Sequence, residues 1–514
     1  MAFSSFGSLL AAAAVAALLF IITGAVYRVY FSRNSHIPGP KLAALTYLYQ
    51  SYYDIYPYQG QWLFHQIELH KQYGPVVRVG PDEIHIDNPD FYNEFAGTSK
   101  QRRDKSATWY WFSDMDQTIG LSAFATLDHD RHAHLRSAMN GFFAKRKVQE
   151  LEDRVKVHVK KMTSRLLEYK ATGELVNLLS LASALTLDVI SEYSFGKSVD
   201  CLDTRDLGAP LRAQLESGVQ LHPVARQFRL IIRAMLRGMA YASAKFGIPK
   251  EFRKFDDMVA DLTDPAYQKA MQEGEGKSAT ETSIVEAMYH SKILSPAEKT
   301  QLRIRAEAGN LVGAGTETTA RTLAVGLFYV LNDPDIHSRL LAEIRTFMPT
   351  ANSDIPSVVE LTKLPYLTAC LHETTRIAHG VAGRLVRISP DKDLFCNNVR
   401  TPKGSTFSVS HYIQHTNPKI FPEPFAFKPD RFLGEKSGEA FRYLVAFGKG
   451  PRMCLGMNLA WSEMCLSLVA LIGGVDMELV GTTVEDVTVR REYFLGLFPK
   501  ESKGIRARVN GLQK

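Results

Sequence analysis

Apolar residues recur along most of this chain at the spacing of helices, and only short segments alternate as strands do. The pattern predicts a helix over about 62–73, mainly helical stretches over 148–195 and 205–300, and one long helix over about 300–331. Segments 76–79 and 83–86 flank a Gly-Pro-Asp turn, which predicts a hairpin. The expected fold is therefore mainly α with small β-sheets.

Residues 9–27 form the most strongly apolar segment and carry no charge. Their number is close to the roughly 20 residues that a helix needs to span a bilayer. A cleaved signal peptide is the alternative, but no charged residue precedes the segment. Arg28 and Arg33 follow it and predict that the rest of the chain faces the cytosol. We expect a membrane anchor and the start of a hinge over 1–36, then one catalytic domain over 37–514, because no linker or repeat divides the remainder.

Composition narrows the class of protein. The 514 residues are 45% hydrophobic, enough for a large core, and the net charge of +7 is modest for this length. That charge does not indicate nucleic-acid binding, but it allows a basic patch for an acidic protein partner or membrane lipid. The five cysteines are odd in number and contain no C-x-x-C pair, which indicates a reducing compartment without a disulfide framework.

A glycine-rich loop over 446–456 carries the strongest chemical signal. It includes Cys454, near the expected start of an apolar helix, where the helix dipole and free N–H groups favour a thiolate that can bind a metal. Arg452 supplies a fixed cation suited to a carboxylate, and the glycines let the backbone approach a flat group. The alternative is a buried cysteine that acts as a small hydrophobic residue.

The long helix over about 300–331 contains glycines and hydroxyls between 308 and 319, which lower its helix propensity. In this segment Glu317 and Thr318 place an acid next to a hydroxyl. Ala314 leaves space beside them, and Asn310, one turn earlier, is either a polar contact to a substrate or a structural amide. Packing of small residues against a neighbouring helix is the alternative interpretation of the segment.

Together these elements resemble the cytochrome P450 family. The run Phe447-x-x-Gly-x-Arg452-x-Cys454-x-Gly resembles its haem-thiolate loop, and the segment 308–318 resembles its oxygen-activating motif. The resemblance implies the cytochrome P450 fold, with a single large haem domain behind a transmembrane helix. It also implies haem b as cofactor, Cys454 as the axial ligand of the iron, and Phe447 and Arg452 as further cofactor-binding residues.

Other basic residues gain a role from the same resemblance. His132 and Arg136 lie four apart and hence on one face of a predicted helix, where such a pair is commonly solvated. The resemblance implies instead that both contact the haem propionates, with His132 where many members have tryptophan. By position Arg384 matches the family's propionate-binding arginine, and Arg387 is close enough to leave the choice open.

A further set resembles the salt-bridged triad that the family places behind the haem. It consists of Glu373 and Arg376, spaced as Glu-x-x-Arg, and of Arg431 in a proline-rich stretch. Asp430 stands where glutamate is commoner, a tolerable difference because Arg431 is the member of the triad. Taken alone, an acid and a base three apart usually form a weak surface bridge.

The implied function is monooxygenation: one oxygen atom of O2 enters a small lipophilic substrate by hydroxylation or epoxidation. Glu317 and Thr318 would then be catalytic residues that deliver protons. Because the chain has no flavin or nicotinamide fingerprint, the expected electron donor is NADPH–cytochrome P450 reductase, with cytochrome b5 as an additional donor. The expected location is the endoplasmic reticulum membrane, as a single-pass protein with a cytosolic catalytic domain.

Segments 36–46, 52–54 and 79–86 resemble the trichodiene-oxygenase-like cytochromes P450 of filamentous fungi. This likeness implies secondary-metabolite biosynthesis and favours a terpenoid substrate over a polyketide or an alkaloid. One alternative is an isomerase or dehydratase of the same fold that does not use O2, although the intact Glu317–Thr318 pair argues against it. Another is a non-catalytic haem protein for electron transfer or gas sensing.

Overall fold

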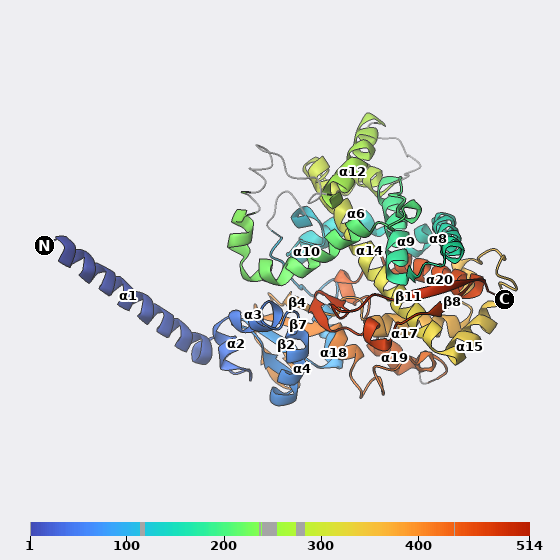
Figure 1. Cartoon of the computed structure of the whole chain (residues 1–514). Helices are drawn as coiled ribbons and strands as arrows, with labels where there is room; N and C mark the ends of the chain where they lie inside the picture. The colour runs from blue at the N-terminus through green and yellow to red at the C-terminus, as the bar shows by residue number, and fades with distance from the viewer. Residues whose placement is uncertain are drawn as a thin grey trace.

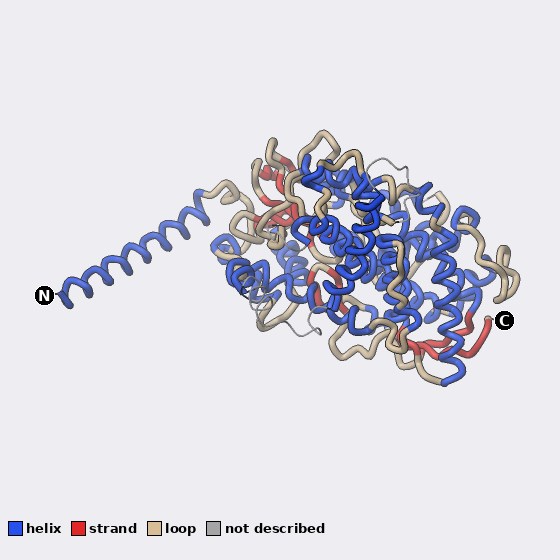
Figure 2. Tube along the Cα trace, turned by 90° about the horizontal axis from the view of Figure 1, so that it is seen from above, coloured by secondary structure: helices blue, strands red, loops and turns tan. Residues whose placement is uncertain are grey.

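The computed structural model of the protein describes residues 2–113, 119–235, 238, 254–273, 283–435 and 437–513. One rod-like helix, α1 (Ala2–Val26), projects from a broad helical body (Figure 1). Strands gather mainly at two ends of this body, one beside the exit of α1 and the other near the C-terminus (Figure 2). The predicted fold, mainly α with small sheets, is confirmed.

Most of the body consists of helices joined by loops. The longer helices are α4 (Trp62–Tyr73), α6 (His129–Asn140), α8 (Glu152–Thr172), α9 (Leu178–Phe195), α10 (Ala209–Gln227), α12 (Lys254–Glu273), α14 (Gln301–Asn332), α15 (Pro334–Ile344), α17 (Pro365–Ala378) and α20 (Met457–Gly474). The shorter ones are α2 (Lys41–Leu45), α3 (Leu48–Asp54), α5 (Tyr92–Ala96), α7 (Lys145–Glu150), α13 (Ile284–His290), α16 (Val358–Leu361), α18 (His411–His415) and α19 (Ser437–Tyr443). The helices predicted over 62–73 and about 300–331 correspond to α4 and α14.

Helix α14 runs through the centre of the body (Figure 1). It packs along α9 and also contacts α17 and α20. Helix α9 is buried on nearly all sides, as expected for a helix that is apolar all round. The side chain of Asn177 caps it by accepting from the N–H of Leu179 at 3.0 Å. This packing fixes α14 and the start of α20, the two elements that carry the candidate chemistry.

The largest sheet has four strands in the order β1 (Val76–Arg78), β2 (Glu83–Ile86), β7 (Thr406–Ser410) and β4 (Arg384–Ile388). β1 and β2 form the predicted antiparallel hairpin, β2 runs parallel to β7, and β7 runs antiparallel to β4. The smaller sheets are β3 (Val176–Asn177) with β11 (Arg506–Leu512) and β8 (Val475–Leu479), β5 (Leu394–Cys396) with β6 (Val399–Thr401), and β9 (Arg491–Tyr493) with β10 (Leu495–Leu497). The four-stranded sheet places both candidate arginines, 384 and 387, on β4.

Helix α1 is followed by a short π-helical turn over Tyr27–Phe31. Among the described helices, three segments are long and apolar enough to cross a membrane: Ala11–Phe31, Leu178–Phe195 and Met457–Gly474. The last two are α9 and α20, which are buried in the body, whereas no part of the tested window in Ala11–Phe31 is buried. The apolar helix thus lies where the membrane anchor was predicted.

Candidate active site

The glycine-rich loop before α20 presents the thiol of Cys454. Its N–H donates to the carbonyl of Phe447 at 2.8 Å and closes the loop on itself. Gly450 has a φ of +73°, and a Cβ there would lie 2.6 Å from the carbonyl oxygen of Gly97, so only glycine fits. Cys454 is exposed, whereas the other four cysteines are buried. Helix α20 begins at Met457, so the thiol lies just before the helix rather than in its first turn.

Groups near the loop act on this thiol in opposite directions. Desolvation by the surrounding protein raises the pKa of Cys454, while a hydrogen bond from the N–H of Gly456 and the charge of Arg136 lower it. Arg136 on α6 is tied to the loop because its Nη1 donates to the carbonyl of Met453 at 2.7 Å. Both groups that lower the pKa favour the thiolate, which is the form that binds a metal.

Five basic side chains gather beside this loop, and we call them the cationic cluster: Lys105, His132, Arg136, Arg387 and Arg452. Burial and the neighbouring charges lower the pKa of His132 to about 2 and that of Arg452 to about 9. The same causes hold the pKa of Lys105 well below its ordinary value. Among the described residues, no carboxylate forms an ion pair with a member of the cluster.

The arginines and the lysine of the cationic cluster have more N–H groups than the hydrogen bonds that they make with the described residues. Among the described residues, Arg452 donates to main-chain carbonyls alone, those of Arg103 and residues 126–128, at 2.8 to 3.3 Å. Arg387 donates to the carbonyl of Val386 at 2.9 Å, and the Lys105 ammonium donates to the carbonyl of Phe124. A guanidinium has five N–H groups and an ammonium three, so both retain donors for another partner. Buried cations without carboxylate partners are costly, and the cluster therefore fits an anionic ligand.

The structure separates the two arginines between which the sequence left a choice. Arg384 and Arg387 are three apart on β4, so their side chains leave opposite faces of the strand. The Arg384 Nε donates to the carboxylate of Glu83 at 2.5 Å, and its Nη2 donates to Gln50 at 2.8 Å. Arg387, by contrast, belongs to the cationic cluster with Arg452. Of these two arginines, Arg387 is therefore the one that lies beside the cysteine loop.

The side chains of Glu317 and Thr318 leave α14 in different directions. Glu317 is buried, receives a hydrogen bond from Ser183 on α9 at 3.4 Å and pairs with Arg321 at 3.5 Å. Burial, only partly offset by Arg321, raises the pKa of Glu317. Thr318 is half-buried, and its hydroxyl donates to the carbonyl of Ala314 at 2.8 Å. Ala314 is exposed in the middle of this largely buried helix, so Thr318 borders open space and Glu317 does not.

The glycines of α14 do not interrupt it, since the helix is continuous from Gln301 to Asn332. A Cβ on Gly309 would lie 3.4 Å from Val259 of α12, and one on Gly315 would lie 3.1 Å from Ile190 of α9. These small residues therefore serve the close packing of α14 against its neighbours, which was the alternative interpretation of the segment. Asn310 is half-buried, and the described contacts assign it no hydrogen bond.

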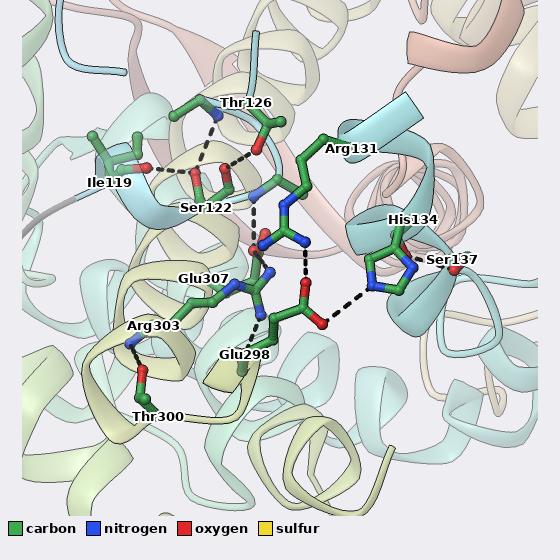
Figure 3. Close-up of polar contacts among 12 residues, drawn as sticks. Ile119, Ser122, Thr126, Arg131, His134, Ser137, Glu298, Thr300, Arg303 and Glu307 are labelled. Atoms are coloured by element: carbon green, nitrogen blue, oxygen red, sulfur yellow. Dashed lines mark hydrogen bonds and ion pairs between the residues drawn. The ribbon is translucent and has the colours of Figure 1, made fainter. Parts of the chain in front are cut away.

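Polar contacts join the first half of α14 to the loop before α6, and they join Glu298, just before α14, to α6 itself (Figure 3). Glu307 is buried, accepts from the N–H of Ala123 at 2.8 Å and lies 3.5 Å from Arg303. Burial raises the pKa of Glu307 to about 7. Glu298, just before α14, pairs with Arg131 of α6 and accepts from His134 of α6 at 3.2 Å when that nitrogen is protonated. These contacts join α6, which carries His132 and Arg136, to the segment just before α14.

The predicted salt-bridged triad is present and buried. Glu373 binds Arg376 through two bonds of 2.7 and 2.8 Å, and both side chains are fully buried. Arg431 lies 3.3 Å from the same carboxylate, and Arg376 also donates to the carbonyl of His415 at 3.0 Å. Asp430 instead pairs with an exposed arginine on α15. The triad therefore stabilises the fold between α17 and the cysteine loop.

Lys105 and Glu307 are the site residues that sequence reasoning missed. Lys105 lies in a loop without periodicity, between the rings of Tyr110 and Phe124, each 4.1 Å from its ammonium. Its signal in the sequence is a lysine shortly before the aromatic residues 109–112. Glu307 falls on the buried face of α14, where a carboxylate is rare without a partner, and that position could have marked it.

Comparison with known proteins agrees with this geometry. The family model "Cytochrome P450" matches residues 42–501. Cytochrome P450 monooxygenase ucsK of Acremonium sp is 43% identical, over 98% of each chain. Tryptophan 6-hydroxylase fscE of Fusarium equiseti is 32% identical over 98% of each chain, and conidiogenone synthase PchP450 of Penicillium rubens is 32% identical over 94% of this chain and 96% of its own.

The chain belongs to the cytochrome P450 family. It is a monooxygenase, as its fungal relatives are named. Membership implies a haem whose iron is bound by a cysteine thiolate, a redox partner that supplies electrons, O2 and a substrate. The exposed Cys454 and the unpaired cations beside it fit such a group, because they offer a metal ligand and donors for carboxylates.

Proposed function

We propose that this protein binds haem b through Cys454 and inserts one atom of O2 into a small lipophilic substrate in fungal secondary metabolism. The observation that carries the proposal is an exposed thiol beside four basic side chains, Lys105, Arg136, Arg387 and Arg452, that form no ion pair with a carboxylate of the described residues. Haem b provides a metal for the thiol to bind and two propionates for the basic side chains to contact. When bound, thiolate-ligated haem activates O2 for insertion into a C–H bond.

In this proposal, Lys105, Arg136 and Arg387 donate to the propionates. Arg452 has one N–H left for them after its bonds to main-chain carbonyls, and the unpartnered Nδ1 of His132 is a further contact. Arg387 takes the role for which the sequence favoured Arg384. Phe447 has a structural role in this proposal, because its main-chain carbonyl accepts a hydrogen bond from the N–H of the ligating cysteine.

Exchanging each arginine of β4 for glutamine separates the two roles. Arg387→Gln should weaken haem binding by about tenfold or more, because a charge-assisted hydrogen bond contributes roughly 1.5–3 kcal/mol. Arg384→Gln should leave haem binding largely intact and lower the unfolding free energy, because Glu83 loses its buried partner. Haem transfer to an acceptor protein and denaturant unfolding measure the two effects. The opposite pattern would return the role to Arg384.

Thr318 and Glu317 are proposed to deliver protons to O2 at the haem. The Thr318 hydroxyl borders open space and can turn from the carbonyl of Ala314 to a ligand. Glu317 lies behind it, and burial raises the pKa of its carboxyl, which favours the protonated form. A water-linked path between them would be needed, because the two side chains diverge.

Thr318→Ala should raise the NADPH consumed per product formed several-fold while haem content stays unchanged. Thr316→Ala is the matched control: its hydroxyl makes the same type of bond, to the carbonyl of Val312 at 2.7 Å, but is buried. NADPH consumption and product are measured together with the reductase present. Equal coupling in both variants would remove the proton-delivery role of Thr318.

The membrane anchor is proposed to hold the protein on the endoplasmic reticulum as a single-pass helix, with the domain from residue 37 onward in the cytosol. Apolar side chains are also exposed on α2, α3 and the segment after α10, and α3 contacts both α2 and α10. They are Leu42, Leu48, Tyr52, Phe228, Leu230 and Ile231. This surface offers a second, weaker attachment to lipid.

Deletion of residues 1–30 should release most of the protein from microsomal membranes. The exposed surface should leave a salt-resistant, detergent-sensitive fraction that Leu230→Ser with Ile231→Ser removes. Fractionation after a carbonate wash measures both steps. If the deleted protein remains fully bound, the segment after α10 is the main attachment and α1 is not.

The proposed electron donor is NADPH–cytochrome P450 reductase, with cytochrome b5 as an additional donor. A terpenoid remains the first choice of substrate, and the name of the conidiogenone synthase relative does not contradict it. A tryptophan derivative is the second, because two relatives are named tryptophan 6-hydroxylase and N-acetyltryptophan 6-hydroxylase. Co-expression with the reductase in hosts that make either scaffold, followed by product identification, decides between them.

A further inference from the structure

A second group of buried polar residues lies apart from the cysteine loop, around the ring of Trp109. We call it the Trp109 cluster: Asp54 of α3, Trp109, His222 and Arg226 of α10, and Arg384 of β4. The guanidinium carbons of Arg226 and Arg384 lie 4.4 and 4.2 Å from the centre of the Trp109 ring, and the His222 ring lies 5.0 Å from it. Arg226 also pairs with Asp54 at 2.8 Å, and both side chains are buried.

Three side chains of this cluster each keep one buried polar atom without a hydrogen bond among the described residues. These atoms are Asp54 Oδ1, Arg384 Nη1 and His222 Nε2. The His222 Nδ1 accepts from the indole N–H of Trp111 at 3.2 Å, so in the neutral ring the proton is on Nε2. Burial lowers the pKa of His222 to about 3, which keeps the ring neutral. The cluster therefore offers two free donors and one free acceptor.

Shared contacts of their other polar atoms hold the three residues together. Gln50 bridges two of the residues, since it donates to Asp54 at 2.8 Å and accepts from Arg384 at 2.8 Å. His222 lies one turn before Arg226 on α10 and so on the same face. A buried polar atom without a partner is costly, so the site is expected to bind a ligand group or water.

The balance of charge in the Trp109 cluster determines which chemical group can bind there. The positive charges of Arg226 and Arg384 are matched by Asp54 and Glu83. Glu492 of β9 adds a third buried carboxylate, and burial together with the nearby Asp54 raises the pKa of Glu492 to about 7. The site thus has no positive charge left for a carboxylate. A neutral hydroxyl, which both donates and accepts, satisfies the free donors and the free acceptor.

The Trp109 cluster lies between the exposed apolar surface beside the membrane anchor and the residues next to the cationic cluster. Helix α10 contacts both α3 and β9, next to the exposed apolar side chains beside the membrane anchor. On the inner side, Glu492 accepts from the N–H of Phe494 at 2.5 Å, at the turn between β9 and β10. The Phe494 ring lies 6.4 Å from that of Phe124, whose carbonyl accepts from Lys105 of the cationic cluster.

We propose that the Trp109 cluster is a binding site for a neutral hydroxyl group of the substrate, at the end that lies away from the haem. Asp54 Oδ1 accepts from the hydroxyl, and Arg384 Nη1 and His222 Nε2 donate to its oxygen. The site orients an otherwise lipophilic substrate and favours substrates that already carry a hydroxyl. The reaction that supplies the substrate is then one that leaves a hydroxyl group, such as an oxygenation, a hydrolysis or the reduction of a carbonyl. This inference rests on the proposed haem-dependent function.

The test uses probes that bind the iron whatever the natural substrate is. Imidazoles carrying an unbranched alkyl tail, in a graded series of lengths, end in methyl, hydroxyl or carboxylate. Their binding to the haem-loaded protein is followed by the shift of the Soret band. At one tail length the hydroxyl probe should bind about fivefold more tightly than the methyl probe, the gain expected from a hydrogen bond to a buried group. The carboxylate probe should bind less tightly than the hydroxyl probe.

His222→Phe and Asp54→Asn should each abolish the preference for hydroxyl. His290→Phe is the matched control, because both ring nitrogens of His290 also lack partners among the described residues, but it lies on α13. His222→Phe keeps the test decisive if Asp54→Asn fails to fold. If the hydroxyl probe never binds more tightly than the methyl probe, or if the preference for hydroxyl survives in both variants, this inference is overturned. The proposed haem function is not affected by either result. Absence of a Soret shift with every probe would overturn the proposed haem function as well.

Discussion

Replacing Cys454 by alanine should reduce product formation to the level of a control without protein. The thiol is the exposed member of the five cysteines, and the loop that holds it is closed by its own N–H and by the conformation of Gly450. Alanine keeps this loop but removes the donor to the metal. The cationic cluster can still attract the propionates, so haem is expected to bind weakly and without a thiolate.

Cys396→Ala is the matched control, since Cys396 is buried on β5 and none of its interactions with described residues involves the proposed site. It should retain nearly full turnover. Both variants are measured with the reductase, using the substrate found by product identification, alongside haem content and circular dichroism. Turnover by a folded Cys454→Ala protein would contradict the assignment of the ligand.

Glu373→Ala should destabilise the protein by about 3–5 kcal/mol, the range for breaking a buried ion pair. The substitution leaves two guanidinium groups, Arg376 and Arg431, without their carboxylate, and Arg376 is fully buried. Since a domain is usually stable by only about 5–15 kcal/mol, little folded haem protein should remain. Denaturant unfolding of the purified protein measures the loss.

The control for Glu373 is Asp430→Ala. Asp430 pairs with Arg339 at 2.9 Å, but both side chains are largely exposed, so the cost should stay within about 0.5 kcal/mol. Equal stability of the two variants would mean that the buried triad contributes no more than a surface bridge. A loss confined to Glu373→Ala supports its structural role.

Local signals in the chain were sufficient for much of the fold. The helix over 62–73 and the hairpin between β1 and β2 were predicted from periodicity and a Gly-Pro-Asp turn, because each depends on neighbouring residues. The loop of Cys454 was recognisable for the same reason: its ligand, glycines and arginine lie within eleven residues of sequence, 446–456. The start of α20 was placed too early, since glycine at 456 delays the helix.

Contacts between distant segments were not predictable from these patterns. Lys105 and Arg387 meet only because the loop before α6 and strand β4 are folded together. The choice between Arg384 and Arg387 depended on which face of β4 meets Glu83, and strand periodicity does not specify that. The Trp109 cluster joins four separate segments, among them Asp54 and Arg226, so no motif in the sequence marks it.

The reduced carbon monoxide difference spectrum of the unmodified, freshly purified protein tests the central claim most directly. If Cys454 binds the haem iron as a thiolate, the spectrum should show a band at about 450 nm. The measurement needs neither substrate nor reductase, and it reports the ligand rather than the reaction. A folded, haem-loaded protein whose band lies near 450 nm, and whose Cys454→Ala variant lacks that band, is the predicted result. A band at the shorter wavelength of haem with a neutral ligand, or a 450 nm band that survives in Cys454→Ala, would contradict the account.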